Sequence, residues 1–219
     1  ALPILLVPID SKALVQPAVE AVRKGIPVIN IDIQLDAQLL EQAGVEVAFV
    51  GPDNFAAAYE VGKLLGKKLR NEDKVAIIEG LAVADNARQR KRGFIKAIEE
   101  KGLRLVASEP ADWETEKAAE VFQAMWMRYP DLKAVYCSND AMALGVLQQM
   151  QEKKCYLPVV GFDNDAVMKE FLSTGKLVAT ADIFSSQMAV RGIEFALDVL
   201  EGRIENRGVH STAYEIIKQ

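Results

Sequence analysis

The sequence contains few of the side chains that build most catalytic and metal-binding sites. Its 219 residues include one histidine and two cysteines, and no Cys or His cluster has the spacing of a metal site. The histidine, His210, lies just before a predicted strand, where a solvated surface position is expected. A phosphate-binding loop and a glycine-rich dinucleotide motif are absent as well. We therefore expect a protein that is not an enzyme and that holds no metal or cofactor.

Positive charge and long apolar runs are also scarce. The formal net charge is −5, and the one basic cluster, residues 88–92, is short and has no interleaved aromatic residues, so nucleic acid is not an expected partner. No apolar run approaches the roughly 20 residues of a membrane-spanning helix. Residues 1–8 are too short, and contain too much proline, for a signal peptide. We expect either a cytosolic protein or one whose leader is not part of this sequence.

What the sequence does contain is a regular alternation of short apolar segments and amphipathic segments. This alternation predicts an α/β fold with parallel sheets flanked by helices and joined by right-handed crossovers. Cys137 and Cys155 then fall at opposite ends of a sheet, which predicts two buried free thiols. Strands are expected at residues 4–9, 27–31, 47–50, 75–79, 105–108, 134–137, 157–162, 177–181 and 210–217, and helices at 16–25, 55–69, 87–101, 116–128, 141–152, 166–173 and 186–201.

Polar residues follow several of the predicted strands, and ligands of open parallel sheets bind beyond the carboxyl ends of the strands. Trp113 lies in a polar loop with no evident core to fill, and its flat face suits the C–H face of a sugar ring. Carboxylates accept and Arg donates, so together they can satisfy hydroxyl groups. Each Asp or Asn at such a junction could instead cap the next helix; Asp140 could do so alone and leave Asn139 for a ligand. The candidate ligand-binding residues are Asp32, Arg90, Trp113, Asn139 and Asp163.

Several motifs resemble the ribose-binding protein and its relatives, which are periplasmic solute-binding proteins of sugar ABC transporters. The clearest are Asn139-Asp140-Ala141-Met142-Ala143-Leu144-Gly145, Val160-Gly161-Phe162-Asp163 and Ala111-Asp112-Trp113. The resemblance implies a two-lobed fold like that of the periplasmic binding proteins. It also implies that the first two strand–helix units of the family are missing, so that the N-terminal lobe is incomplete. That lobe is expected at residues 1–50 plus 184–210, and the C-terminal lobe at 51–183 plus 211–219.

The function that the resemblance implies is capture of a small sugar between two hinged lobes, for uptake through an ABC permease or for chemoreception. The implied location is periplasmic or extracellular. The resemblance places Asp32, Arg90, Trp113, Asn139 and Asp163 at ligand-contacting positions. Ile33 and Ile183 stand where ribose binders usually have Arg and Gln, so we expect a deoxy- or methyl-bearing sugar, or another small polar solute, in place of ribose.

The missing units lead to two further expectations. The strand at 4–9 becomes an exposed apolar edge, which favours self-association, and sugar affinity is expected to be weak. Three alternatives stay open. The chain could be the effector-binding core of a lactose-repressor-type transcription regulator, an enzyme on a doubly wound sheet, or a truncated form that binds nothing.

Overall fold

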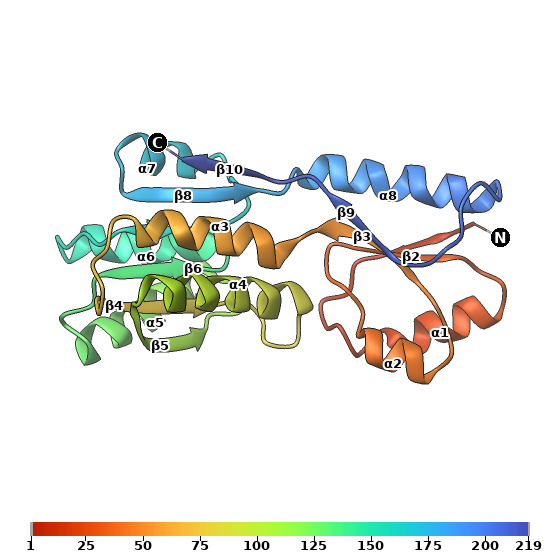
Figure 1. The fold of residues 1–219 in the computed structure, drawn as a ribbon, viewed down its shortest axis with the longest axis horizontal. Coiled ribbons are helices and arrows are strands. Elements are labelled where there is room, and N and C mark those ends of the chain that lie inside the picture. The colour runs from red at the N-terminus through yellow and green to blue at the C-terminus, as the bar shows by residue number, and fades with distance from the viewer. Residues whose placement is uncertain (1, 219) are drawn as a thin grey trace. The chain divides into compact units, whose positions relative to one another are not determined.

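The computed structural model describes residues 2–218, which divide into two compact units. Unit 1 consists of residues 2–53, Val83–Asn86 and Ile183–Ala213, and unit 2 of Asn54–Ala82, Ala87–Asp182 and residues 214–218. Each unit contains a sheet flanked by helices (Figure 1). The α/β class with parallel sheets is therefore confirmed, whereas the expected lobe boundaries and the hinge between the lobes stay predictions.

Unit 1 is built on a four-stranded, all-parallel sheet in the order β1-β2-β3-β9. Two helices, α1 and α2, enclose a small core with one face of the sheet, and α8 lies on the other face (Figure 1). Gly192 of α8 permits close packing, because a Cβ there would lie 2.2 Å from Cδ1 of Ile31. The bounds are β1 Ile4–Leu6, α1 Val15–Arg23, β2 Val28–Ile31, α2 Ala37–Gln42, β3 Ala48–Pro52, α8 Ser185–Leu200 and β9 Val209–Thr212.

Unit 2 is built on a six-stranded sheet in the order β10-β8-β7-β6-β4-β5, in which β10 alone of the described strands is antiparallel to its neighbour. On one face, Phe94 of α4 stacks on Tyr136 of β6 with ring centroids 4.0 Å apart. On the other face, α5, α6 and α7 pack against a large apolar cluster. The bounds are α3 Asn54–Gly66, β4 Lys74–Glu79, α4 Asp85–Lys101, β5 Arg104–Pro110, α5 Thr115–Arg128, β6 Ala134–Cys137, α6 Asp140–Glu152, β7 Val159–Val160, α7 Met168–Ser173, β8 Leu177–Asp182 and β10 Glu215–Lys218.

The observed elements differ from those expected from the sequence at several places. The strand expected at 210–217 is two strands: β9 pairs in parallel with β3, and β10 pairs antiparallel with β8 in the other sheet. Helix α2 was missed, although Asp36 provides a cap by accepting a hydrogen bond from the backbone N–H of Leu39 at 3.0 Å. The first strand is also shorter than expected and ends at Leu6, two residues before Pro8, which has no N–H to donate to a sheet.

The free thiols and the edge position of the first strand were expected from the sequence. Both cysteines are free thiols, but the expectation that both are buried holds for Cys137 alone, because Cys155 is half-buried. Strand β1 is an edge of its sheet. No helix within residues 2–218 has the length and apolar character needed to cross a membrane.

Candidate functional site

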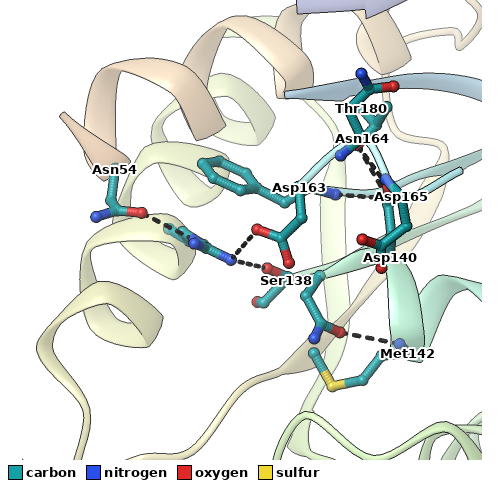
Figure 2. A network of polar contacts seen from close by, with 11 residues as sticks. Asn54, Ser138, Asp140, Met142, Asp163, Asn164, Asp165 and Thr180 are labelled. Carbon is teal, nitrogen blue, oxygen red and sulfur yellow. Dashed lines mark hydrogen bonds and ion pairs between the residues drawn. The ribbon is translucent and has the colours of Figure 1, made fainter. Parts of the chain in front are cut away.

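A buried arginine lies at the centre of the polar groups beyond the carboxyl ends of the strands of unit 2. Arg90 is only 3% exposed. Its Nε donates to Oδ1 of Asn54 at 2.9 Å, and its Nη1 donates to the carbonyl oxygen of Ser138 at 2.8 Å (Figure 2). Oδ1 of Asp163 lies 3.5 Å from the same Nη1. The guanidinium is therefore fixed by groups from three segments that are far apart in the sequence.

Aromatic rings flank this guanidinium. Its Cζ lies 3.7 Å from the ring centroid of Phe162 and 5.5 Å from that of Trp113, within the range of cation–π contacts. Trp113 is half-buried and lies against Gly80, where a Cβ would come within 2.1 Å of the indole. Asp112 and Trp113 have φ values of 52° and 71°. The loop after β5 thus adopts an unusual backbone conformation at the tryptophan that the sequence singled out.

Asp163 also lies in a strained segment. Its φ is 109° and that of Asn164 is 59°, values that non-glycine residues rarely adopt. The backbone N–H of Asp163 donates to the carbonyl of Ala181 at 2.7 Å. The Asn164 side-chain amide donates to Asp182 at 2.9 Å. These bonds tie the loop after β7 to strand β8 and its carboxyl end.

The structure decides which of Asn139 and Asp140 caps α6, and the alternative in which Asp140 does so alone is wrong. Asn139 is the N-cap of α6, because its Oδ1 accepts from the backbone N–H of Met142 at 2.9 Å. Asp140 is buried and accepts hydrogen bonds from the backbone N–H groups of Phe162 and Asp165, each at 2.9 Å (Figure 2). Burial raises the pKa of Asp140 to about 7, against the lowering effect of its hydrogen bonds.

The five expected site residues fall in different parts of the structure. Arg90, Trp113 and Asp163 lie together in unit 2, and Asn139 begins helix α6 of the same unit. Asp32 belongs to unit 1, where it follows β2 with a φ of 66°. The ligand-binding roles of all five stay predictions.

Sequence reasoning missed several residues that build this region. Asn54 was not among the predicted site residues, yet it accepts a hydrogen bond from Arg90. Thr180 donates from β8 to both carboxylate oxygens of Asp140. No spacing rule pairs residues 36 or 40 positions apart, so only the order of strands in the sheet could have suggested these contacts.

A separate cavity of about 420 Å³ lies within unit 1, lined mainly by α8 and the segment from His210 to Ala213. None of the five expected site residues lines it. His210 is exposed, as expected, and its ring contacts that of Phe195. Within residues 2–218, no group of three His, Cys, Asp or Glu side chains is placed to hold a metal ion.

Comparisons with known proteins agree on one family. The profile of the periplasmic binding protein domain matches residues 3–204. The D-ribose/D-allose-binding protein of Pseudomonas aeruginosa is 41% identical over 98% of this chain and 69% of its own length. The D-allose-binding periplasmic protein of Escherichia coli is 35% identical over 89% of this chain and 64% of its own length. The chain therefore spans about two thirds of the length of these curated relatives.

Solved structures give the same answer. An ABC transporter solute-binding protein from Burkholderia multivorans superposes with a TM-score of 0.94 at 38% identity, over 99% of this chain and 77% of that one. One from Actinobacillus succinogenes with bound D-allose superposes with a TM-score of 0.91 at 32% identity, over 99% and 78%. Extent of match and identity together show that this chain belongs to the periplasmic binding protein family.

Proposed function

We propose that this chain is a solute-binding protein that captures a small sugar in the periplasm and delivers it to an ABC permease. The observation that carries the proposal is the pairing of buried Arg90 with half-exposed Asp163 beside Trp113 and Phe162. Family membership and the relatives that bind D-ribose or D-allose support a transport role over the regulator and enzyme alternatives. A chemoreceptor as second partner stays a prediction.

The chemistry of the Arg90 region suits hydroxyl groups. Nε and Nη1 of Arg90 contact protein groups, whereas residues 2–218 supply no acceptor to Nη2. Asn139 caps its helix through Oδ1, and its Nδ2 donates to no group in this part of the chain. A sugar hydroxyl accepts from such donors and donates to the Asp163 carboxylate. An aromatic face covers the apolar side of a sugar ring.

A thermal-shift screen tests this proposal. D-allose, D-ribose, D-fucose and D-arabinose at millimolar concentration are each mixed with the chain, because a ligand that binds the native state raises its melting temperature. We expect at least one sugar to raise it, and the Asp163→Ala variant to lose the increase. Asp131→Ala, which removes an exposed carboxylate paired with Lys74, is the matched control and keeps the response. A wild-type chain that responds to no sugar would refute the proposal.

The same screen separates the candidate sugars. Ile33 and Ile183 place apolar side chains where ribose binders usually have polar ones, so they predict a deoxy- or methyl-bearing sugar. D-fucose, a 6-deoxy sugar that carries a methyl group, represents that class. A stronger response to D-ribose than to D-fucose would contradict this prediction.

We also propose that two copies of this chain associate through unit 1. Edge strand β1 carries exposed apolar residues, and Leu2, Val7 and Ile9 beside it are 85%, 54% and 74% exposed. On α8, a stripe spaced three, four and three residues apart is also exposed, namely Val190, Ile193, Leu197 and Leu200. Residues 2–9 carry no charge, so two copies of this edge can pair without like-charge repulsion. A two-fold axis perpendicular to the sheet would place both α8 helices on one face, stripe against stripe.

Sedimentation velocity tests the association. We expect a concentration-dependent dimer, and the double change Ile193→Glu plus Leu197→Lys is expected to shift the population toward monomer. Arg191→Ala, on the same helix and exposed, is the control and leaves the dimer unchanged. A wild-type chain that sediments as a monomer at every concentration would contradict the proposal.

A further inference from the structure

We propose that Asp140 positions Asp163 for the ligand, and that protonation of Asp140 weakens sugar binding. The inference rests on the proposed function, because it concerns the geometry of the same site. Asp140 does not contact the solute in this proposal; it acts through the loop that carries Asp163.

One carboxylate holds this loop on both sides of Asp163. Oδ1 of Asp140 accepts from the backbone N–H of Phe162, and Oδ2 accepts from that of Asp165, each at 2.9 Å (Figure 2). The backbone N–H of Asp140 donates in return to the carbonyl of Phe162 at 2.7 Å. The Thr180 hydroxyl donates to Oδ1 at 2.9 Å and accepts from the backbone N–H of Asn164 at 3.2 Å. The N–H groups of residues 162, 164 and 165 are thus all bound by Asp140 or by its partner Thr180.

The loop needs this support because of its backbone conformation. Asp163 and Asn164 both have positive φ, and such conformations cost roughly 1–3 kcal/mol each and persist only where the surroundings hold them. The loop backbone packs tightly against the Asp140 carboxylate, because a Cβ on Gly161 would lie 1.9 Å from Oδ1 of Asp140. If one of the hydrogen bonds to Asp140 is lost, the strained loop relaxes and the Asp163 carboxylate moves from its place beside Arg90.

Asp140 is also a group whose charge can change near neutral pH. Its pKa is raised to about 7, first by burial and further by the negative charges of Asp163 and Asp165 from the loop after β7. The Asp165 N–H and the Thr180 hydroxyl from β8 act in the opposite direction. Another titratable neighbour, Cys137 of β6, stays a neutral thiol because burial raises its pKa.

The direction of the pH effect follows from the hydrogen bonds. Above pH 7 the ionised carboxylate accepts from both backbone N–H groups with full strength. As the pH falls through about 7, a proton occupies one oxygen and weakens the bond on that side. Sugar affinity should therefore be high at pH 8 and lower at pH 6. By linkage, a sugar that prefers the ionised state must also lower the pKa of Asp140 and release protons on binding.

Isothermal titration calorimetry with D-allose and D-ribose at pH 6 and pH 8 tests the inference. For the wild-type chain we expect an affinity at least about fivefold higher at pH 8, consistent with the loss of one hydrogen bond to a charged group. In Asp140→Asn, the amide cannot accept on both sides, so we expect weak binding that does not change with pH. Thr180→Ser keeps the hydroxyl and should keep the pH dependence of affinity seen in the wild-type chain. Thr180→Val removes the hydroxyl and should lose that pH dependence.

A second measurement needs no variant and holds even if Asp140→Asn fails to fold. Titration of the wild-type chain at pH 7 in two buffers of different ionisation enthalpy reports the protons released on binding, and we expect net release. Sugar binding with equal affinity at both pH values and no proton release would overturn the role of Asp140 while the proposed function stands. Absence of binding at pH 8 would refute the proposed function itself.

Discussion

Replacing Arg90 by methionine is expected to abolish detectable sugar binding and to lower the free energy of unfolding by about 2–4 kcal/mol. Methionine provides an apolar chain in place of the Arg90 stem but removes the guanidinium that lies over the Phe162 ring, and all of its donors with it. Oδ1 of Asn54 and the carbonyl of Ser138 then lose their buried partner, and each unsatisfied buried acceptor is costly. Asp163 loses the positive charge beside it, so the acceptor for the sugar is no longer held in place.

Urea unfolding and calorimetric titration measure these two effects on the same sample. Arg92→Met is the matched control, because Arg92 lies two residues further along α4 with an exposed side chain. That control should bind sugar like the wild-type chain and change stability by less than about 0.5 kcal/mol. If Arg90→Met binds sugar as tightly as the wild-type chain, the assignment of the site to this arginine is wrong.

Gly161→Ala is expected to have the second largest effect, with a loss of about 1–3 kcal/mol of stability and of sugar binding together. Its Cβ would lie 1.9 Å from Oδ1 and 3.2 Å from Cγ of Asp140, and Ala143 lies behind at 3.5 Å. Asp140 cannot move away without breaking its hydrogen bonds to Phe162 and Asp165. The loop must shift instead, and Asp163 shifts with it.

The control for this change is another glycine-to-alanine substitution with room for the new methyl group. At Gly66 the nearest atom to a Cβ is Cγ of Lys101, at 3.3 Å on a flexible side chain. Gly66→Ala at the end of α3 should be neutral or slightly stabilising and should leave binding unchanged. Thermal unfolding monitored by circular dichroism, with sugar titration, compares the two variants. A Gly161→Ala protein as stable as Gly66→Ala would contradict the tight packing around Asp140.

Much of the fold could be predicted because its strands and helices carry their own periodic patterns. Segments such as Ala134–Cys137 and residues 75–78 of β4 are short and fully buried, so a continuous apolar run marks them. Helix α2 has six residues and one buried side chain, Leu40, so it offers too little periodicity to detect. The last segment was read as one strand because nothing in its sequence shows that the chain leaves one sheet at Thr212 and enters another at Glu215.

The candidate site was predictable in its residue types and less so in their contacts. Arg90 and Asp163 follow β4 and β7, and the rule for parallel sheets places them near the same edge. The sequence left open which of Asn139 and Asp140 caps α6, because both residues can cap a helix. The choice between them depends on the N–H groups of Phe162 and Asp165, which require a buried acceptor and find it in Asp140. Such a demand arises only when β7 and α6 are packed together.

The most direct test of the site is a ¹H–¹⁵N NMR titration of the labelled chain with D-allose. Sugar bound beyond the carboxyl ends of the unit 2 strands should shift the Trp113 indole N–H, the Arg90 Nε–H and the Asp163 backbone amide, all with one dissociation constant. The amide of Gly66, at the far end of α3 from Asn54, should not shift. Saturable binding that leaves the Trp113, Arg90 and Asp163 signals unmoved would contradict the assignment of the sugar site to this region.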